Sequence, residues 1–364
     1  DVLAILEQGS SWRNAALAAL NKLPLPIDGD IAATLRELDE KLVEAPNHGE
    51  IERRLRIGIV ALLATASDEN SSNYLRRLWR SEPERRPIIA MALAQEPDGD
   101  NWDYLVRSLN VLEDEAAEEV VNALRTVAVA TDDPMALRQL ILLGVKAEKK
   151  KAKFEGMEAL LEHWTGMQRP QDAEKSMRPW QKWYAKTYPD RPAAELPNEN
   201  ESRWDFEQLV NYISSNKGNQ GNPDEGRNIF AKAKCVQCHR VGDEGQSVGP
   251  ELTGIASRFS KREILESILY PSHIISDQYA SKKVLTLNGQ AFTGMLSEAG
   301  EDSLQIRDSN NQLLVIQEES VDQILPSNSS IMPAGLLDDS SLQEISDLMS
   351  FLGVVPAVEI AKRP

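Results

Sequence analysis

The chain has only two cysteines, and both lie in the pentapeptide Cys235-Val236-Gln237-Cys238-His239. The pattern C-x-x-C-H is the attachment sequence of a c-type haem, in which both thiols add to the haem vinyl groups and the histidine binds the iron. Iron with an axial imidazole is a redox centre whose potential depends on its other ligand and on burial. The pentapeptide therefore predicts one covalently attached haem c, held by Cys235 and Cys238, with His239 as an iron ligand.

Two other kinds of site also use a C-x-x-C pair. A structural zinc ion needs four nitrogen or sulfur ligands, and the three remaining histidines, His48, His163 and His273, do not lie at ligand spacing. A thioredoxin-like redox pair lies at a strand-to-helix junction, whereas this pair follows a helical pattern and lies in a polar segment. The sequence favours covalent haem over both alternatives.

The composition narrows the range of partners. The 364 residues are 41% hydrophobic and 27% charged, with a formal net charge of −17, which is typical of a soluble globular protein of two or three domains. So acidic a chain argues against nucleic acid or an anionic membrane surface as a partner, and no apolar run is long enough for a membrane span. Because the chain begins at Asp1 and not at a methionine, we expect a processed product or a fragment.

Apolar residues recur at helical spacing through residues 1–164. One such stripe is Ile31, Leu35, Leu38 and Leu42, and the next is Leu55, Ile59, Leu62 and Ala66. Further helical segments are expected at Tyr74–Trp79, Pro87–Leu93, Trp102–Leu109, Glu118–Val127, Met135–Val145 and Phe154–Trp164. Short paired helices without a strand signal resemble an α-solenoid of HEAT type. Such a stack can present a binding surface or act as a spacer, and the sequence leaves both open.

The rest of the chain divides into three predicted parts. Residues 165–221 contain prolines typical of a connecting segment, and Trp180, Trp183 and Tyr184 within it are expected to pack across the end of the helical stack. Residues 222–352 are expected to form a second, haem-carrying domain, and residues 353–364 a C-terminal tail.

Local signals place both helices and strands in the second domain. A helix is expected to begin at Pro223, and Ser341-Leu342-Gln343-Glu344 is a capping-box pattern that begins a closing helix. Between them, Asn288-Gly289 predicts a hairpin with a type I′ turn. A second hairpin is predicted from Ser303–Arg307 and Leu313–Gln317. The predicted fold is therefore mainly α, with a small antiparallel β insertion at residues 281–326.

The second domain resembles a class I c-type cytochrome. The residues that carry this resemblance are Gly226, Phe230, Cys235-Val236-Gln237-Cys238-His239, Val248-Gly249-Pro250-Glu251-Leu252-Thr253-Gly254 and Ile331-Met332-Pro333. A longer pattern is similar to the haem-binding domain family of planctomycetes and verrucomicrobia, and it adds Tyr270-Pro271-Ser272, Leu287-Asn288-Gly289 and Met332-Pro333-Ala334-Gly335-Leu336-Leu337-Asp338. In that family the domain often follows helical repeats, and longer members carry a dehydrogenase portion upstream.

The resemblance assigns roles to individual residues. Cys235 and Cys238 are the thioether residues and His239 is the proximal ligand, while the carbonyl of Pro250 accepts a hydrogen bond from Nδ1 of that histidine and orients it. Gly249-Pro250 is also a common turn sequence, so that reading stays open.

Met332 is our candidate for the second iron ligand, because it lies in a loop just before the closing helix, next to Pro333 and Gly335. Met91, Met135, Met157 and Met349 lie on helical apolar stripes and are expected in the core, Met167 and Met177 lie in the connecting segment, and Met295 lies in the inserted sheet. The alternative ligand is His273, although a lone loop histidine is more often solvated.

Arg258 could pair with a haem propionate or lie in solvent. Lys232, Lys234 and Arg240 could guide docking of an acidic partner or form a solvated face.

These residues predict a monohaem module that relays single electrons from a dehydrogenase portion or partner to a soluble acceptor. The motif implies a periplasmic or otherwise exported location. No Ser-His-Asp set, glycine-rich phosphate loop or H-E-x-x-H pattern is present, so we expect no catalysis by the chain itself. Two alternatives remain open, namely a haem enzyme or gas sensor with an open iron site, and a helical docking scaffold with an accessory haem.

Overall fold

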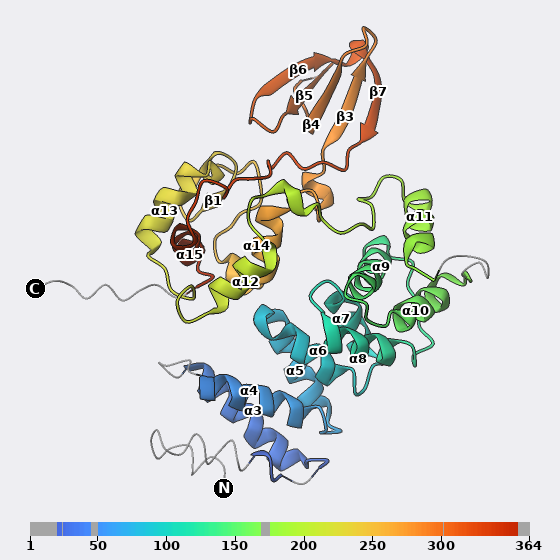
Figure 1. The fold of residues 1–364 in the computed structure, drawn as a ribbon, viewed down its shortest axis with the longest axis vertical. Coiled ribbons are helices and arrows are strands. Elements are labelled where there is room, and N and C mark those ends of the chain that lie inside the picture. The colour runs from blue at the N-terminus through green and yellow to red at the C-terminus, as the bar shows by residue number, and fades with distance from the viewer. Residues whose placement is uncertain (1–19, 24, 45–49, 169–174, 301, 356–364) are drawn as a thin grey trace, which may run out of the picture. The chain divides into compact units, whose positions relative to one another are not determined.

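The computed structural model describes residues 20–355, apart from residue 24, residues 45–49, residues 169–174 and residue 301. The chain forms two compact units, Asp1–Pro179 and Trp180–Pro364 (Figure 1). Most of the predicted C-terminal tail, at residues 356–364, lies outside the described residues. Among the described helices, none has both the length and the apolar character that crossing a lipid bilayer requires.

The first unit is built from helices. They are α3 (Gly29–Glu44), α4 (Glu50–Leu63), α5 (Glu69–Ser81), the short 3₁₀ helix η1 (Pro83–Arg85), α6 (Arg86–Leu93), α7 (Asp100–Ser108), α8 (Asp114–Leu124), α9 (Pro134–Lys149) and α10 (Glu155–Thr165). Each predicted helical segment overlaps one of these helices, so the periodicity located the helices correctly. Side-chain caps are present at the starts of two of these helices: the Asp68 carboxylate accepts from the Ser71 amide at the start of α5, and the Asp133 carboxylate accepts from the amides of Met135 and Ala136 at the start of α9.

The helices of the first unit stack in two rows. Consecutive helices pack on each other as in α3 with α4, α5 with α6, and α9 with α10. In addition, α3, α5 and α7 contact one another in turn, as do α4, α6, α8 and α10. Two rows of stacked helix pairs are the arrangement of an α-solenoid. Its assignment to the HEAT class stays a prediction.

A buried cluster of charges lies inside the first unit. Asp39 is 0% exposed and receives hydrogen bonds from Arg56, Arg85 and Tyr74 at 2.9–3.2 Å. Burial raises the pKa of Asp39, but the neighbouring Arg85 and Arg56 outweigh that effect and hold this pKa below its ordinary value. Glu82 completes the cluster at 2.6 Å from Arg56. Because each charge has a partner, the cluster joins α3, α4, α5 and η1 without an isolated buried ion.

The second unit carries helices around one apolar core. They are α11 (Arg178–Thr187), which begins at the boundary of the units, η2 (Glu199–Glu201), α12 (Phe206–Ser214), α13 (Pro223–Lys232), η3 (Cys235–Gln237), η4 (Ile255–Ser257), α14 (Lys261–Leu269), η5 (Asp277–Tyr279) and α15 (Leu342–Phe351). A short ribbon of β1 (Arg240–Val241) and β2 (Glu244–Gly245) follows η3. The prediction of a mainly α chain is confirmed.

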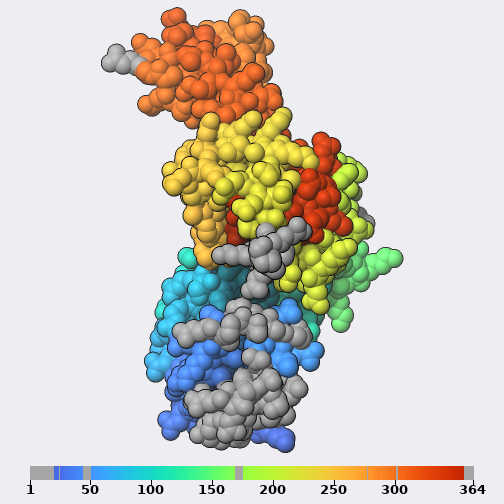
Figure 2. Space-filling model, turned by 90° about the vertical axis from the view of Figure 1, so that its left-hand side faces the viewer, coloured from blue at the N-terminus to red at the C-terminus, as the bar shows by residue number. Residues whose placement is uncertain are grey.

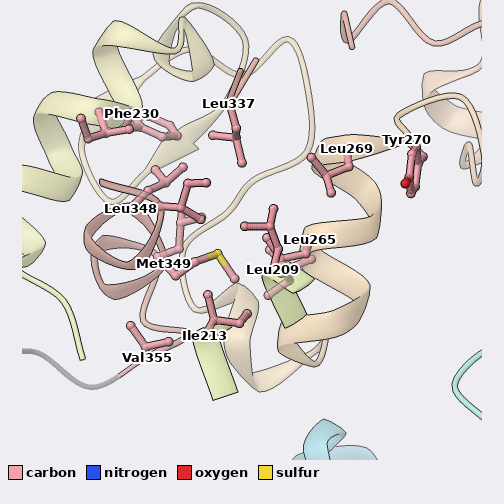
Figure 3. Close-up of a cluster of buried hydrophobic side chains, with 14 residues drawn as sticks. Leu209, Ile213, Phe230, Leu265, Leu269, Tyr270, Leu337, Leu348, Met349 and Val355 are labelled. Carbon is pink, nitrogen blue, oxygen red and sulfur yellow. The ribbon is translucent and has the colours of Figure 1, made fainter. Parts of the chain in front are cut away.

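The core of the second unit joins α12, α13, α14 and α15 (Figure 3). Phe230 from α13 is 1% exposed and Met349 from α15 is 0% exposed, and the Met349 thioether points toward Leu209 of α12 and Leu265 of α14. This core begins earlier than residue 222, the expected start of the haem-carrying domain, because α12 contributes Leu209 and Ile213. Part of the expected connecting segment therefore belongs to the core.

A close helix crossing holds α13 against α15. A Cβ atom built on Gly226 would overlap the backbone carbonyl of Asp347 and lie 2.8 Å from Cβ of Phe351. Only glycine lets the two helix backbones approach this closely. The capping box predicted at Ser341 is present, since Ser341 and Glu344 exchange side-chain to backbone hydrogen bonds at the start of α15.

Two aromatic side chains of α11 are buried. Trp180 is 3% exposed and Tyr184 is 1% exposed, and edge-to-face ring contacts join Trp180 to Trp183 and Trp183 to Tyr188. Their predicted position across the end of the helical stack concerns both units and stays a prediction.

The predicted β insertion is an antiparallel sheet. Within the described residues its strands are β3 (Lys282–Thr286), β4 (Ala291–Glu298), β5 (Ser303–Arg307), β6 (Leu313–Gln317) and β7 (Val321–Pro326), in the order β6-β5-β4-β3-β7. The last strand returns to pair with the first after the 3₁₀ helix η6 (Glu318–Ser320). One face buries Val284, Ile306 and Ile316 as a core of its own. The atoms of this sheet, orange in Figure 2, form a compact body.

Both predicted hairpins are present, but the turn at Asn288-Gly289 differs from the predicted type I′. A type I′ turn needs two central residues with positive φ, whereas of Asn288 and Gly289 only Gly289 has one, at +82°. The second hairpin repeats this form, with Asn311 at φ +60°. In both, a single left-handed residue closes a turn that is longer than two residues.

Candidate functional site

The cysteine segment is a tight turn that directly follows α13. Lys234 adopts φ +63° and ends the helix, and η3 then runs from Cys235 to Gln237. The carbonyl of Cys235 accepts hydrogen bonds from the amides of Cys238 at 3.1 Å and His239 at 2.8 Å. This turn holds both cysteines and the histidine in one short segment. Both thiols are free and partly exposed, so they are accessible for covalent attachment.

The imidazole of His239 is oriented by the backbone of a second loop. Its Nδ1 lies 2.8 Å from the carbonyl oxygen of Pro250. A carbonyl oxygen can only accept, so Nδ1 carries the proton and Nε2 keeps its lone pair. Burial lowers the pKa of His239, although the bond to Pro250 works in the opposite direction. The ring is therefore held neutral, in the tautomer that suits a metal ligand.

Gly249 leaves room for that ring. A Cβ on Gly249 would lie 2.8 Å from Cε1 and 3.0 Å from Nδ1 of His239, too close for any side chain. The amides of Val248 and Gly249 donate to the carbonyl of Cys238 at 3.0 and 2.7 Å. The loop that orients the imidazole is thus bonded to the cysteine segment itself. The contact between His239 and Pro250 that the resemblance implied is present, and its role beside a bound haem stays a prediction.

The environment of the two thiols differs from that of a reactive C-x-x-C pair. Burial raises the pKa of Cys235 to about 11. Burial also raises the pKa of Cys238, although the Arg307 guanidinium pulls it down. Reactive C-x-x-C pairs work through a thiol with a lowered pKa, so the environment of these cysteines argues against that alternative.

The donor set of the site fits a covalently held haem better than zinc. Two accessible thiols, an oriented neutral imidazole and the clearance at Gly249 are all in place. Half-buried Leu252, Ile255 and Ile268 pack against the core and offer apolar surface to a porphyrin. Among the described residues, no group of three or more His, Cys, Asp or Glu side chains could hold a metal ion. His48 lies outside the described residues.

Met332 lies in a loop fixed by short polar contacts. Its amide donates to Oγ of Ser330 at 3.1 Å, and the Ser330 amide donates to Oγ of Ser272 at 3.0 Å. The Met332 side chain is half-buried. Its role as an iron ligand stays a prediction.

The other methionines mostly have structural positions. Met157, Met177 and Met349 are buried, at 5%, 0% and 0% exposed. The expectation of a core position is wrong for Met135, which is 42% exposed because it lies in the first turn of α9 on the solvent side. Because these three buried thioethers pack in apolar cores, they are not candidates for the second iron ligand.

His273 is not a solvated loop residue. Its side chain is 6% exposed, and its Nε2 lies 3.6 Å from Oε1 of Glu266 on α14. Only Nε2 faces this carboxylate, so His273 remains an alternative to Met332 as an iron ligand.

The basic residues around the motif are largely engaged within the domain. Arg258 donates to the carbonyl of Glu251 at 2.7 Å, and its pairing with a propionate stays a prediction. Lys232 lies 2.9 Å from Glu344, and Arg240 lies 2.7 Å from Glu251. These pairs reduce the basic character that the sequence indicated beside the motif.

Sequence analysis missed two residues of the inserted sheet that reach the cysteine segment. The side-chain amide of Asn311 donates to the carbonyl of Gln237 at 3.1 Å, and Arg307 donates to Oδ1 of Asn311 at 2.6 Å. The only local signal was an asparagine, in place of glycine, at the turn of the second hairpin.

Comparison with known protein families agrees with this geometry. Residues 223–302 match the family model of cytochrome c, a stretch that begins at the start of α13 and includes the motif and the Gly249-Pro250 loop. No curated protein sequence matches the chain. The second unit therefore contains a cytochrome c domain, a family whose members carry covalent haem. The planctomycete-type subfamily stays a prediction.

Proposed function

We propose that this chain is a monohaem electron-transfer module in which Cys235 and Cys238 hold one haem c. In this proposal His239 and Met332 would be the side chains that ligate the haem iron. The module relays single electrons from a dehydrogenase portion or partner protein to a soluble acceptor.

One observation carries the proposal. Within the C-x-x-C-H segment, the His239 imidazole has its Nδ1 bound to the Pro250 carbonyl at 2.8 Å, and no residue other than glycine at position 249 would clear the ring. An isolated histidine in a turn would not need this support. The support fixes the ring and strengthens Nε2 as a donor.

Bound haem would supply a one-electron redox centre. The chain's own residues determine what that centre does. Of the chain's own side chains, the His239 imidazole would be the stronger donor to the iron and the Met332 thioether the weaker one, which would raise the potential relative to two imidazoles. If both side chains ligate the iron, a substrate has no place to bind there, so the module would pass electrons without catalysis of its own.

The compartment and the partners follow from the same chemistry. Thioether attachment of haem is typical of exported proteins, which supports a periplasmic or equivalent location. The helical first unit supports a role in placing the module near a partner, as stacked helices offer extended surfaces.

The test is the variant Met332→Ala in the full-length haem-loaded protein. We expect the weak long-wavelength absorption band of methionine-ligated ferric haem to disappear and the midpoint potential to fall, since a thioether stabilises the reduced iron. The control Met135→Ala removes an exposed thioether from the first unit and should leave both unchanged. An unchanged spectrum in Met332→Ala would show that another residue is the ligand.

Carbon monoxide separates this proposal from an open-iron enzyme or sensor. The ferrous wild type should bind the gas slowly or not at all, because Met332 must first leave the iron. Rapid and complete binding would contradict the proposal. A colourless protein with the mass of its amino acids alone would refute haem attachment itself.

A further inference from the structure

The second hairpin of the inserted sheet bonds directly to the segment that carries the cysteines. The turn between β5 and β6 places Asn311 against the carbonyl of Gln237, 74 positions earlier in the chain, at 3.1 Å. Gln237 immediately precedes Cys238. The sheet therefore contacts the rest of the unit through this turn as well as through the chain that enters and leaves it.

A comparison of the two hairpin turns indicates why the second turn has an asparagine at position 311. Both turns close with one left-handed residue, Gly289 in the first hairpin and Asn311 in the second. Glycine adopts this conformation without a steric cost, while asparagine tolerates it at some cost. What asparagine adds is an amide group, and that group donates to Gln237 and accepts from Arg307.

Arg307 is a cation without a carboxylate partner at this position. It is half-buried, at the end of β5, and its guanidinium donates to Oδ1 of Asn311 at 2.6 Å. Within the described part of the chain no ion pair neutralises it, in contrast to Lys232 with Glu344 and Arg240 with Glu251. One side-chain amide thus joins an uncompensated positive charge to the haem-attachment segment.

We propose that the β5–β6 hairpin fixes the haem-attachment segment through Asn311 and that Arg307 thereby raises the midpoint potential of the haem. This inference rests on the proposed function. A nearby positive charge disfavours ferric iron more than ferrous iron, because the oxidised centre carries one more positive charge. Partial burial weakens the screening of this interaction by salt.

The first test compares two charge-removing variants of the full-length, haem-loaded protein. Arg307→Gln should lower the midpoint potential, so that the ratio of reduced to oxidised protein at a fixed potential falls by a factor of roughly two to five. Lys283→Gln removes the same charge from an exposed position on β3, which β4 separates from β5. Its effect should be clearly smaller. Equal shifts in the two variants would overturn the role of Arg307.

The second test uses Asn311→Gly, which suits the turn but removes the amide. We expect amide hydrogen exchange in the segment around Gln237 to become about fivefold faster, the loss expected for one hydrogen bond. The midpoint potential should shift in the same direction as in Arg307→Gln, because Arg307 loses its anchor. Unchanged exchange would overturn the role of the hairpin.

The two readouts keep this inference separate from the proposed function. If Met332→Ala fails to change the spectrum while the Arg307 and Asn311 variants behave as expected, only the assignment of the ligand is wrong. If the ligand assignment holds while Arg307→Gln matches Lys283→Gln, only the inference is wrong.

Discussion

The two units of the chain use polar groups in opposite ways. In the first unit, buried Asp39 is saturated with partners, receiving hydrogen bonds from Arg56, Arg85 and Tyr74. In the second unit the core is apolar, and the imidazole of His239 is oriented at one nitrogen while its other nitrogen keeps a lone pair. A cluster in which every charge has a partner stabilises the fold, whereas an imidazole that is held at one nitrogen can bind a metal ion through the other. The difference identifies the second unit as the one that carries the chemistry.

The largest effect is expected from breaking the buried cluster of the first unit. Asp39→Asn leaves Arg56 and Arg85 with Glu82 as their remaining carboxylate, and it should lower the free energy of unfolding by about 3 kcal/mol, the lower end for removing one partner of a buried ion pair. Denaturant unfolding followed by circular dichroism would measure this. The absorbance of the second unit should remain unchanged at the denaturant concentrations that unfold the first.

A matched control for this variant lies on the surface of the same unit. Glu40 and Arg77 form an ion pair with both side chains more than half exposed. Glu40→Gln should cost less than about 1 kcal/mol, because water screens exposed pairs. Equal losses in Asp39→Asn and Glu40→Gln would show that the buried cluster has no special structural role.

The next largest effect concerns the apolar packing of the second unit. Gly226→Ala places a methyl group where α13 meets the Asp347 carbonyl of α15, and it should destabilise this unit by about 1–3 kcal/mol, as overpacking does. The loss of haem absorbance on heating would report it. Gly29→Ala in α3 is the control, since nothing lies within 4 Å of the added Cβ. A stable Gly226→Ala protein would mean that the two helices separate at little cost.

The smallest effect is expected at Glu344, an acidic residue at the start of α15 in the second unit. The Ser341 backbone amide and Lys232 lower the pKa of Glu344 to about 2 from its ordinary value of 4.5. A carboxylate with a lowered pKa stabilises the fold fully above pH 4.5 and loses this effect as the pH falls toward 2. Glu344→Gln should therefore show a smaller decrease of melting temperature between pH 5 and about 2 than the wild type. Parallel decreases would show that the charge of Glu344 does not contribute to stability.

Local chemistry made much of this fold predictable. Pro223 at the start of α13 and the capping box of Ser341 and Glu344 are signals carried by residues close together in sequence, and both helices begin there as expected. The bounds of β5 and β6 were predicted as observed, because the apolar residues of each strand and the turn signal between the strands are local. The cysteine motif is equally local, and its five residues already predict a haem.

Features that depend on distant contacts were not predictable from one sequence. The Asn311 amide meets Gln237 only after the whole sheet has formed. The core position of Leu209 depends on α14 and α15, which follow it by more than fifty residues. The exposure of Met135 was missed because helical periodicity does not show which face of the first turn is covered.

The bond between the loop at Val248–Pro250 and the carbonyl of Cys238 has a consequence for the speed of the proposed reaction. Backbone hydrogen bonds hold the imidazole plane, so that plane need not follow a change of oxidation state. A polar environment arranged in advance requires little nuclear rearrangement when charge moves. For an electron carrier, this favours rapid electron exchange both on reduction and on oxidation.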